Sequence, residues 1–273
     1  MLIDINLSQY HKHSIIRYNK NKNKNKYPDI DLFIEEIPVA ISFNKIVYTV
    51  MMCTPHDLEY FAIGFSLSEG IIIHHRDIHD IDIKKHHNGI EINLNISNRC
   101  LFRLKKKRRS LIGITGCGIC GEEKLDTVCR ELLPVLSQIV FDLNYLEIVI
   151  SQLIAKQELN HLTGSAHAAI YFDLKGHVKV IFEDVGRHIA LDKLVGYINR
   201  HQLSGGAILV TSRASFEMVQ KVASVGVEIL FAISSATKMA IDLADRLNVT
   251  LVGHCRYDRA DVYTHNERIV GKL

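Results

Sequence analysis

Apolar and polar residues alternate along the first half of the chain in short runs that are typical of β-strands. Residues 32–51 carry β-branched and aromatic residues on both sides of Asn44-Lys45, which predicts a β-hairpin turning at that pair. Residues 78–83 and 90–96 alternate isoleucine with polar residues, as half-buried antiparallel strands do. The first half is therefore expected to be rich in antiparallel β-structure.

One helix is predicted between these strands, whereas the chain before them lacks a pattern. Thr54 has the side chain of a helix N-cap, Pro55 suits the first helical position, and Gly70 ends the apolar period that follows. Residues 1–30 include a run of alternating Asn and Lys, a low-complexity stretch without an apolar period. We expect residues 1–30 to be a flexible segment and residues 31–121 to be a smaller α+β region.

The second half changes to a regular alternation of strands and helices. Strands are predicted over residues 166–172, 178–183, 207–211, 228–233 and 249–254. Helices are predicted over residues 122–137, 144–158, 187–199, 214–225 and 236–247. Strands separated by single helices usually pair in parallel through right-handed crossovers. Residues 122–273 are therefore expected to form an α/β domain, with residues 262–264 as an edge strand.

Composition adds limits on the class of protein. The 273 residues are 47% hydrophobic and 23% charged, which is ordinary for a soluble globular protein with an ample core. The net charge of +3 is too small to indicate nucleic-acid binding. No uncharged apolar run reaches the roughly 18 residues of a membrane span, and no signal-peptide pattern is evident. Six cysteines without a regular framework fit a reducing cytoplasm, so we expect a cytoplasmic protein with no membrane partner.

Two cysteines set in glycine, Cys117 and Cys120 in the run 116–121, are the strongest candidates for chemistry. A thiolate attacks electrophiles and carries sulfur, and the flanking glycines remove bulk, so the pair is expected on a mobile loop. The basic block at residues 103–109 is expected to be part of that loop. Positive charge and a following helix N-terminus both favour the thiolate, although Glu122 and its neighbour oppose this.

Three other interpretations of the cysteine pair remain open. A structural zinc site needs four ligands, but the other four cysteines are scattered singly and no second Cys-x-x-Cys exists. A thioredoxin-like redox pair normally opens a helix after an N-terminal strand, whereas this pair follows a hundred residues of other structure. An inert disulfide fits least well, because glycines and short spacing suit exposure.

Four polar clusters follow predicted strands of the second half. They are Glu183–His188, Thr211–Arg213, Ser234–Lys238 and Gly253–Arg259. Ligands of α/β sheets bind outside the carboxyl ends of strands, and helix N-termini attract phosphates. Arginine and lysine in these clusters add cationic partners, so together they predict a phosphate-bearing ligand. His167, set among small residues, is either a packed histidine or a base or metal ligand, and the sequence leaves its role open.

Several of these motifs together resemble a known family. They are Thr115–Gly121, Glu183–His188 with Asp192-Lys193, Thr211–Arg213, Val262–His265, Thr54-Pro55, Gly64-Phe65 and Glu69–Ile72. In this combination they are similar to the formate dehydrogenase accessory sulfurtransferases, the FdhD family, from about residue 35 to the C-terminus. The resemblance implies a cytidine-deaminase-like α/β fold with a mixed or parallel sheet flanked by helices, a homodimer and a cytoplasmic location.

The resemblance also implies an activity and its partners. The protein would take persulfide sulfur from a cysteine desulfurase and pass it to the molybdenum cofactor, a bis-molybdopterin guanine dinucleotide, for formate dehydrogenase. Cys117 would carry the persulfide and Cys120 would assist release or exchange. The cofactor would be bound as cargo, with no tightly held metal of the protein's own. The expected cofactor-binding residues are Thr211, Ser212, Arg213, Ser234, Lys238, His254, Cys255, Arg256, Tyr257, Asp258 and Arg259.

Two alternatives to sulfur transfer are a non-catalytic chaperone that binds the molybdenum cofactor and a dithiol oxidoreductase. Deamination is rejected despite the implied fold, because the zinc signature of His-x-Glu followed by Pro-Cys-x-x-Cys is missing. The chain also departs from the family at 254–259, where a glycine-containing loop is usual and Tyr257 and Asp258 are bulkier. The Asp258 carboxylate is expected to repel phosphate.

Overall fold

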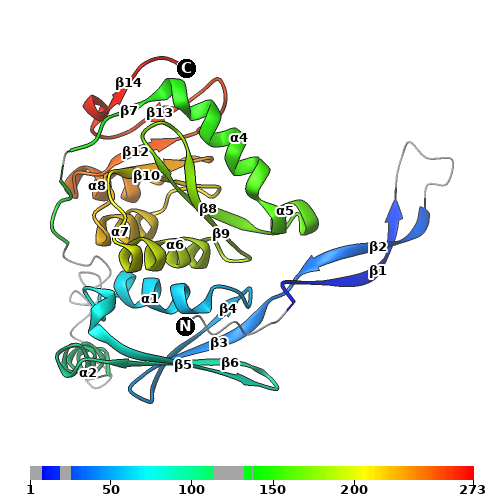
Figure 1. Cartoon of the computed structure of the whole chain (residues 1–273), viewed down its shortest axis with the longest axis vertical. Coiled ribbons are helices and arrows are strands. Elements are labelled where there is room, and N and C mark those ends of the chain that lie inside the picture. The colour runs from blue at the N-terminus through cyan, green and yellow to red at the C-terminus, as the bar shows by residue number, and fades with distance from the viewer. Residues whose placement is uncertain (1–7, 19–25, 113–131, 137) are drawn as a thin grey trace.

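The computed structural model describes residues 8–18, 26–112, 132–136 and 138–273. A hairpin precedes two stacked sheets, with helices between the sheets and on the far face of the second (Figure 1). The mixed sheets flanked by helices confirm the predicted α/β class. None of the described helices is long and apolar enough to cross a membrane.

The hairpin is formed by β1 (Tyr10–Tyr18) and β2 (Lys26–Ile34), which pair antiparallel over nine positions. It projects from the body of the molecule (Figure 1). The expectation that residues 1–30 form a flexible segment is therefore wrong for residues 10–18 and 26–30. Arg17 explains part of the pairing, because its guanidinium bridges Asp29 and Asp31 on the opposite strand. This cross-strand link has no signature in the local sequence.

The four-stranded sheet contains β3 (Ile37–Phe43), β4 (Ile46–Cys53), β5 (Ile78–His86) and β6 (Gly89–Ile96) in the order β4-β3-β6-β5. The predicted turn at Asn44-Lys45 is confirmed, since both residues have the positive φ of a type I′ hairpin turn. The predicted strands at 78–83 and 90–96 are confirmed as β5 and β6.

Helix α1 (Leu58–Ser68) covers this sheet and packs against α6 (Arg187–His201) of the second half (Figure 1). Its N-cap is Asp57, in the left-handed conformation, rather than the expected Thr54. Thr54 is instead fully buried and hydrogen-bonded to the second half of the chain. The backbones of α1 and α6 touch at two glycines: a Cβ at Gly64 would lie 1.8 Å from the carbonyl oxygen of Asp192, and one at Gly196 would lie 2.0 Å from that of Tyr60.

The basic block at 103–109 was expected to be a loop, but it belongs to α2 (Asn98–Ile112). Lysine, arginine and leucine have high helix propensity, and the helix buries Cys100 and Leu104 one turn apart. The predicted helix at 122–137 lies mostly outside the described residues. Its described part, residues 132–136, is not helical, which agrees with the missing backbone donor of Pro134.

The six-stranded sheet has the order β13-β12-β11-β10-β8-β9. Its strands are β8 (His167–Asp173), β9 (Val178–Asp184), β10 (Gly206–Val210), β11 (Ile229–Ala232), β12 (Thr250–Gly253) and β13 (Asp261–Val262). The predicted parallel pairing is confirmed for β10, β11 and β12, and β13 is the predicted edge strand. β8 runs antiparallel to both β9 and β10.

Helices cover both faces of this sheet (Figure 1). One face carries α6, α7 (Phe216–Ser224) and α8 (Lys238–Arg246), and the other carries α4 (Leu146–Lys156) with α5 (Glu158–Thr163) after it. Near α4, the short strands β7 (Phe141–Asp142) and β14 (Ile269–Val270) pair in parallel. The core on the α6 side is continuous with the core beneath α1, so the two halves share one apolar interior. The boundary proposed at residue 121 stays a prediction.

Candidate functional site

The carboxyl ends of four strands lie along one edge of the six-stranded sheet. β10, β11 and β12 run in parallel, and β9 shares their direction because β8 is antiparallel to both β9 and β10. The four polar clusters predicted from the sequence follow these strands, so they lie on a common rim. His167 also lies there, because it begins the reversed strand β8 opposite Asp184.

Backbone hydrogen bonds tie the loops of the rim to one another. The N–H of Ala214 donates to the carbonyl of Ser235, and the N–H of Thr237 donates back to Ala214, both at 3.1 Å. The N–H of His254 donates to the carbonyl of Ser234 at 3.0 Å. The loops after β10, β11 and β12 thus form one continuous ledge.

The part of the rim near β8, β9 and β10 carries several polar groups, two of them without partners among the described residues. Thr211 Oγ1 accepts a hydrogen bond from the N–H of Ala168 and lies 3.5 Å from Nδ1 of His167. Burial lowers the pKa of His167, and the positive charge of Arg187 lowers it further. The buried Nε of Arg187 and Oγ of Ser215 have no hydrogen-bond partner among the described residues. Arg187, which is close enough to His167 to lower its pKa, is suited to hold an anion beside that imidazole.

Two more of the predicted residues, Ser212 and Arg213, complete this loop. Ser212 is buried and its hydroxyl donates to the carbonyl of Arg213, so its side chain stabilises the loop. Arg213 is exposed, and it has no acidic partner within the described part of the chain. Arg213 is therefore the rim cation best placed to meet a ligand in solution.

The predicted cations of the loop 254–259 are already engaged. Arg259 binds both oxygens of Asp261, with Nε–Oδ1 at 3.0 Å and Nη2–Oδ2 at 2.6 Å. Arg259 and His254, whose Nδ1 lies 2.8 Å from Asp261 Oδ2, lower the pKa of Asp261 to about 2. Arg256 donates to the carbonyls of Ile233 and Cys255. The expectation that Arg256 and Arg259 present unpaired charge to phosphate is therefore not met in this conformation.

Other predicted residues fall into three situations. Cys255 is fully buried, and burial raises the pKa of its thiol to about 12, so its side chain belongs to the core and not to the rim. Lys238 is exposed but pairs with Asp242 one turn along α8. Tyr257 and Asp258 are exposed, and Ser234 is half-buried on the ledge.

Beneath the rim, Asp184 joins the two halves of the molecule. Its Oδ2 lies 2.7 Å from Nζ of Lys193 and accepts the backbone N–H of Thr54 at 3.1 Å. Thr54 Oγ1 in turn accepts the N–H of Val185. Asp184, Lys193 and Thr54 have no exposed surface. Three motifs singled out in the sequence therefore form one buried support for the rim.

A second polar cluster lines a cavity of about 380 Å³ between α1, α6 and α7. Asp192 is fully buried there; its Oδ1 accepts from Ser68 Oγ at 2.7 Å and from Lys221 Nζ at 2.6 Å, while Oδ2 has no partner in the described structure. His188 pairs with Glu217, and burial lowers the pKa of that histidine. The cavity thus holds two acid–base pairs side by side.

Cys117 and Cys120 lie outside the described residues. The three described cysteines, Cys53, Cys100 and Cys255, are buried and unpaired.

The residues of these sites that the sequence analysis did not single out are Asp261, Ser215, Glu217 and Lys221. Tyr263, within a quoted motif, packs over Gly253 and lies 3.3 Å from His254 Nδ1. Only Asp261 had a local signal, as an acidic residue two positions after Arg259.

Two comparisons bear on the identity of the chain. The family model of the FdhD/NarQ family matches residues 34–270. A solved structure described as "a putative formate dehydrogenase accessory protein from Desulfotalea psychrophila" superimposes with a TM-score of 0.74 at 23% sequence identity. That match covers 96% of this chain and 100% of the other, and at this identity it supports the fold.

Proposed function

This chain belongs to the FdhD/NarQ family, and from that premise we propose that it acts in formate dehydrogenase maturation as a sulfur carrier. It receives sulfane sulfur from a cysteine desulfurase and passes it to the molybdenum cofactor, which it binds as cargo. The similarity to a structure described as a putative formate dehydrogenase accessory protein supports formate dehydrogenase as the enzyme whose maturation the chain serves. The glycine-flanked pair Cys117 and Cys120 supports the sulfur chemistry.

The proposed transfer needs two thiols for a complete electron balance. The Cys117 thiolate attacks the outer sulfur of the desulfurase persulfide, and the desulfurase thiolate leaves. At the cargo, the Cys120 thiolate attacks Sγ of Cys117, which forms a Cys117–Cys120 disulfide and releases the outer sulfur as hydrosulfide. A cellular dithiol then reduces the disulfide. This scheme gives Cys117 the carrier role and Cys120 the release role.

The observation that carries the cargo assignment is the rim with its unpartnered donors. Arg187 Nε and Ser215 Oγ are buried without partners among the described residues, and exposed Arg213 lies on the same rim. A guanine dinucleotide offers phosphate oxygens, which charge-assisted donors bind well. The loop 254–259 would add Arg259 only by breaking its pair with Asp261.

The cofactor-binding chaperone is the second candidate, because the rim supports it without any cysteine. Mass spectrometry after incubation with a cysteine desulfurase and cysteine distinguishes the two. We expect added sulfur mass on the peptide that holds Cys117, its loss in Cys117→Ala, and its retention in Cys120→Ala. Full formate dehydrogenase maturation by Cys117→Ala would overturn the sulfur-carrier assignment and favour the chaperone. Turnover of a disulfide substrate would favour the dithiol oxidoreductase.

Calorimetry with GDP tests the rim independently of the cysteines. Each charge-assisted hydrogen bond contributes about 1.5–3 kcal/mol, so Arg213→Ala is expected to weaken binding tenfold or more. Asp258→Gly is expected to tighten binding, because it removes a carboxylate from the exposed loop. The control is Arg246→Ala, at the opposite end of α8, with unchanged affinity. Absence of GDP binding by the unmodified protein would place the cargo elsewhere.

A further inference from the structure

The cavity of about 380 Å³ between α1, α6 and α7 has no part in the proposed sulfur transfer. Its volume falls within the roughly 300–1,000 Å³ that is usual for small-molecule sites. β4 and α1 of the first half contribute one part of its wall, and α6 and α7 of the second half contribute the rest (Figure 1). A molecule bound there would therefore contact both halves of the protein.

Asp192 is a residue of this cavity whose hydrogen bonding is incomplete. Its side chain has no exposed surface, and Oδ1 accepts from Ser68 Oγ and Lys221 Nζ. Oδ2 is buried without a partner within the described structure. A buried carboxylate oxygen that lacks a donor costs free energy, and burial accordingly raises the pKa of Asp192. Because Asp192 belongs to the lining, a donor inside the cavity is placed to satisfy this oxygen.

The charge of the lining favours a positively charged donor. The lining includes three carboxylates, those of Glu69, Asp192 and Glu217, and one ammonium, that of Lys221. His188 Nε2 lies 2.5 Å from Oε2 of Glu217, but burial lowers the pKa of the imidazole and so favours its neutral form. Even with Asp192 protonated, two carboxylates would face one ammonium. The cavity therefore attracts cations.

The remaining lining is largely apolar and suits an aliphatic chain. Phe65 comes from α1, Phe216 from α7 and Met51 from β4. Such side chains cover methylene groups, and aromatic rings also attract an ammonium group to their faces. The acidic positions lie at different depths, because Asp192 is fully buried whereas the Glu217 side chain is 48% exposed. A chain with an ammonium at each end matches this arrangement.

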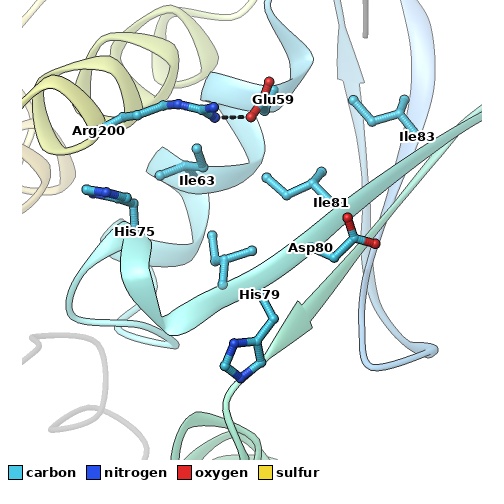
Figure 2. A pocket seen from close by; sticks show the side chains of 9 residues that line it. Glu59, Ile63, His75, His79, Asp80, Ile81, Ile83 and Arg200 are labelled. Carbon is cyan, nitrogen blue, oxygen red and sulfur yellow. Dashed lines mark hydrogen bonds and ion pairs between the residues drawn. The ribbon is translucent and has the colours of Figure 1, made fainter. Parts of the chain in front are cut away.

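The larger groove beside β5 lacks this combination. Its volume is about 700 Å³, and isoleucine side chains of α1 and β5 belong to its lining (Figure 2). Its opposite charges Glu59 and Arg200 already pair with each other. None of its described lining residues has a buried side-chain nitrogen or oxygen without a partner. The smaller cavity is therefore the better candidate for a ligand site.

We propose that the cavity between α1, α6 and α7 binds a short linear aliphatic diamine. One ammonium donates to Oδ2 of Asp192, while Lys221 stays on Oδ1. The other ammonium lies against Glu217 at the mouth, and the methylene chain packs on Phe65 and Phe216. The proposal is independent of the sulfur-carrier assignment, because neither Cys-x-x-Cys nor the rim takes part.

Calorimetry at constant ionic strength with three probes of one chain length tests the two-ended site. Diaminobutane has two ammonium groups, butylamine has one, and butanediol has none. Diaminobutane should bind about tenfold or more tightly than butylamine, because butylamine lacks one charge-assisted hydrogen bond. Butanediol should not bind. Absence of diaminobutane binding, or equal affinity for diaminobutane and butylamine, would overturn the proposal.

Two variants separate the ends of the site. Glu217→Gln removes the charge at the mouth, so this variant should bind diaminobutane no more tightly than butylamine. Asp192→Asn removes the deep charge and should weaken both probes about tenfold. Glu147→Gln on α4 and Asp173→Asn at the end of β8 are the matched controls outside the lining, and both should keep the affinities of the unmodified protein.

The Glu217→Gln arm remains informative if Asp192→Asn does not fold, because Glu217 is about half exposed and its loss leaves the buried pair of Asp192 and Lys221 intact. A Glu217→Gln variant that keeps the full preference for diaminobutane would reject the site. The same preference lost in Glu147→Gln would reject it as well, since it would show that the amines respond to the overall charge of the protein.

Discussion

Nζ of Lys193 lies 2.7 Å from Oδ2 of Asp184, and neither side chain has any exposed surface. The two residues belong to α6 and β9, and Asp184 also accepts the backbone N–H of Thr54. Lys193 itself donates to the carbonyls of Thr54 and Glu183. The pair therefore fixes the segment that leads into α1 against β9, the strand that ends at the rim.

Removing the cation of this pair should destabilise the protein strongly. Lys193→Met keeps the length of the side chain but leaves the Asp184 carboxylate buried without its partner, which costs about 3–5 kcal/mol. Urea unfolding followed by circular dichroism measures the change. Lys179→Met is the control, because Lys179 pairs with Asp173 at the surface and such pairs contribute about 0–1 kcal/mol. Equal losses in the two variants would show that the burial of the pair is unimportant.

The protonation of His167 should respond to Arg187. Burial and then the Arg187 charge lower the pKa of His167 below its ordinary value of about 6.5. Arg187→Gln should raise that pKa, as the imidazole ring protons report in an NMR titration. Arg246→Gln, on the distant end of α8, should leave it unchanged.

The same shift has a consequence for stability. Because the folded-state pKa of His167 is lower than the unfolded-state value, its contribution to stability is fully present above pH about 6.5 and is lost as pH falls. The acid limb of the stability curve should therefore move to lower pH in Arg187→Gln. No movement, together with an unchanged pKa of His167, would contradict the electrostatic contact between the two residues.

The crossing of α1 and α6 should tolerate no side chain at its two glycines. Alanine at Gly64 or Gly196 places a Cβ within 2.0 Å of a backbone carbonyl oxygen of the other helix. The helices must then separate, and the expected loss is about 3 kcal/mol or more in thermal or urea unfolding. Gly226→Ala has open space around its Cβ and only a positive φ to strain, so it should lose about 1 kcal/mol. A Gly64→Ala variant as stable as Gly226→Ala would disprove the close approach.

The described cysteines should be inert in the folded protein. Burial raises the pKa of Cys53 above its ordinary range and that of Cys255 to about 12. Iodoacetamide at pH 8 should therefore leave the peptides of both residues unmodified until urea is added. A raised thiol pKa stabilises the fold below the ordinary value of about 8.5, and this contribution is lost as pH rises toward 12. Rapid labelling of Cys255 in the folded protein would show that its thiol is accessible at the rim and not buried in the core.

The sequence predicted those elements whose signals are local. The turn at Asn44-Lys45 needs residues that tolerate positive φ, and the strands around it alternate visibly. The common rim followed from strand direction, since parallel strands end on the same edge. The reversal of β8 was not predicted, because nothing in a strand's own sequence fixes the direction of its neighbour.

The expectations that the structure did not meet failed for different physical reasons. Arg17 meets Asp29 and Asp31 only once the hairpin has formed, so the low-complexity run hid a strand pair. The charge of Arg259 was assigned to a ligand, although Asp261 lies only two positions later, because the sequence alone does not show that the loop brings the two side chains together. Basic residues in α2 were interpreted by charge, whereas their propensity and the apolar positions Cys100 and Leu104 decided the structure.

The projecting hairpin will alter how the molecule moves through a solvent. A nine-residue strand is roughly 30 Å long, so β1 and β2 add a lever comparable in length to the radius of a compact body. They lie almost entirely before residue 34, where the match to the family model begins. A particle of this shape tumbles and diffuses more slowly than a sphere of equal mass. Elution volume alone would therefore overestimate the mass of a single copy, whereas light scattering measures the mass independently of shape.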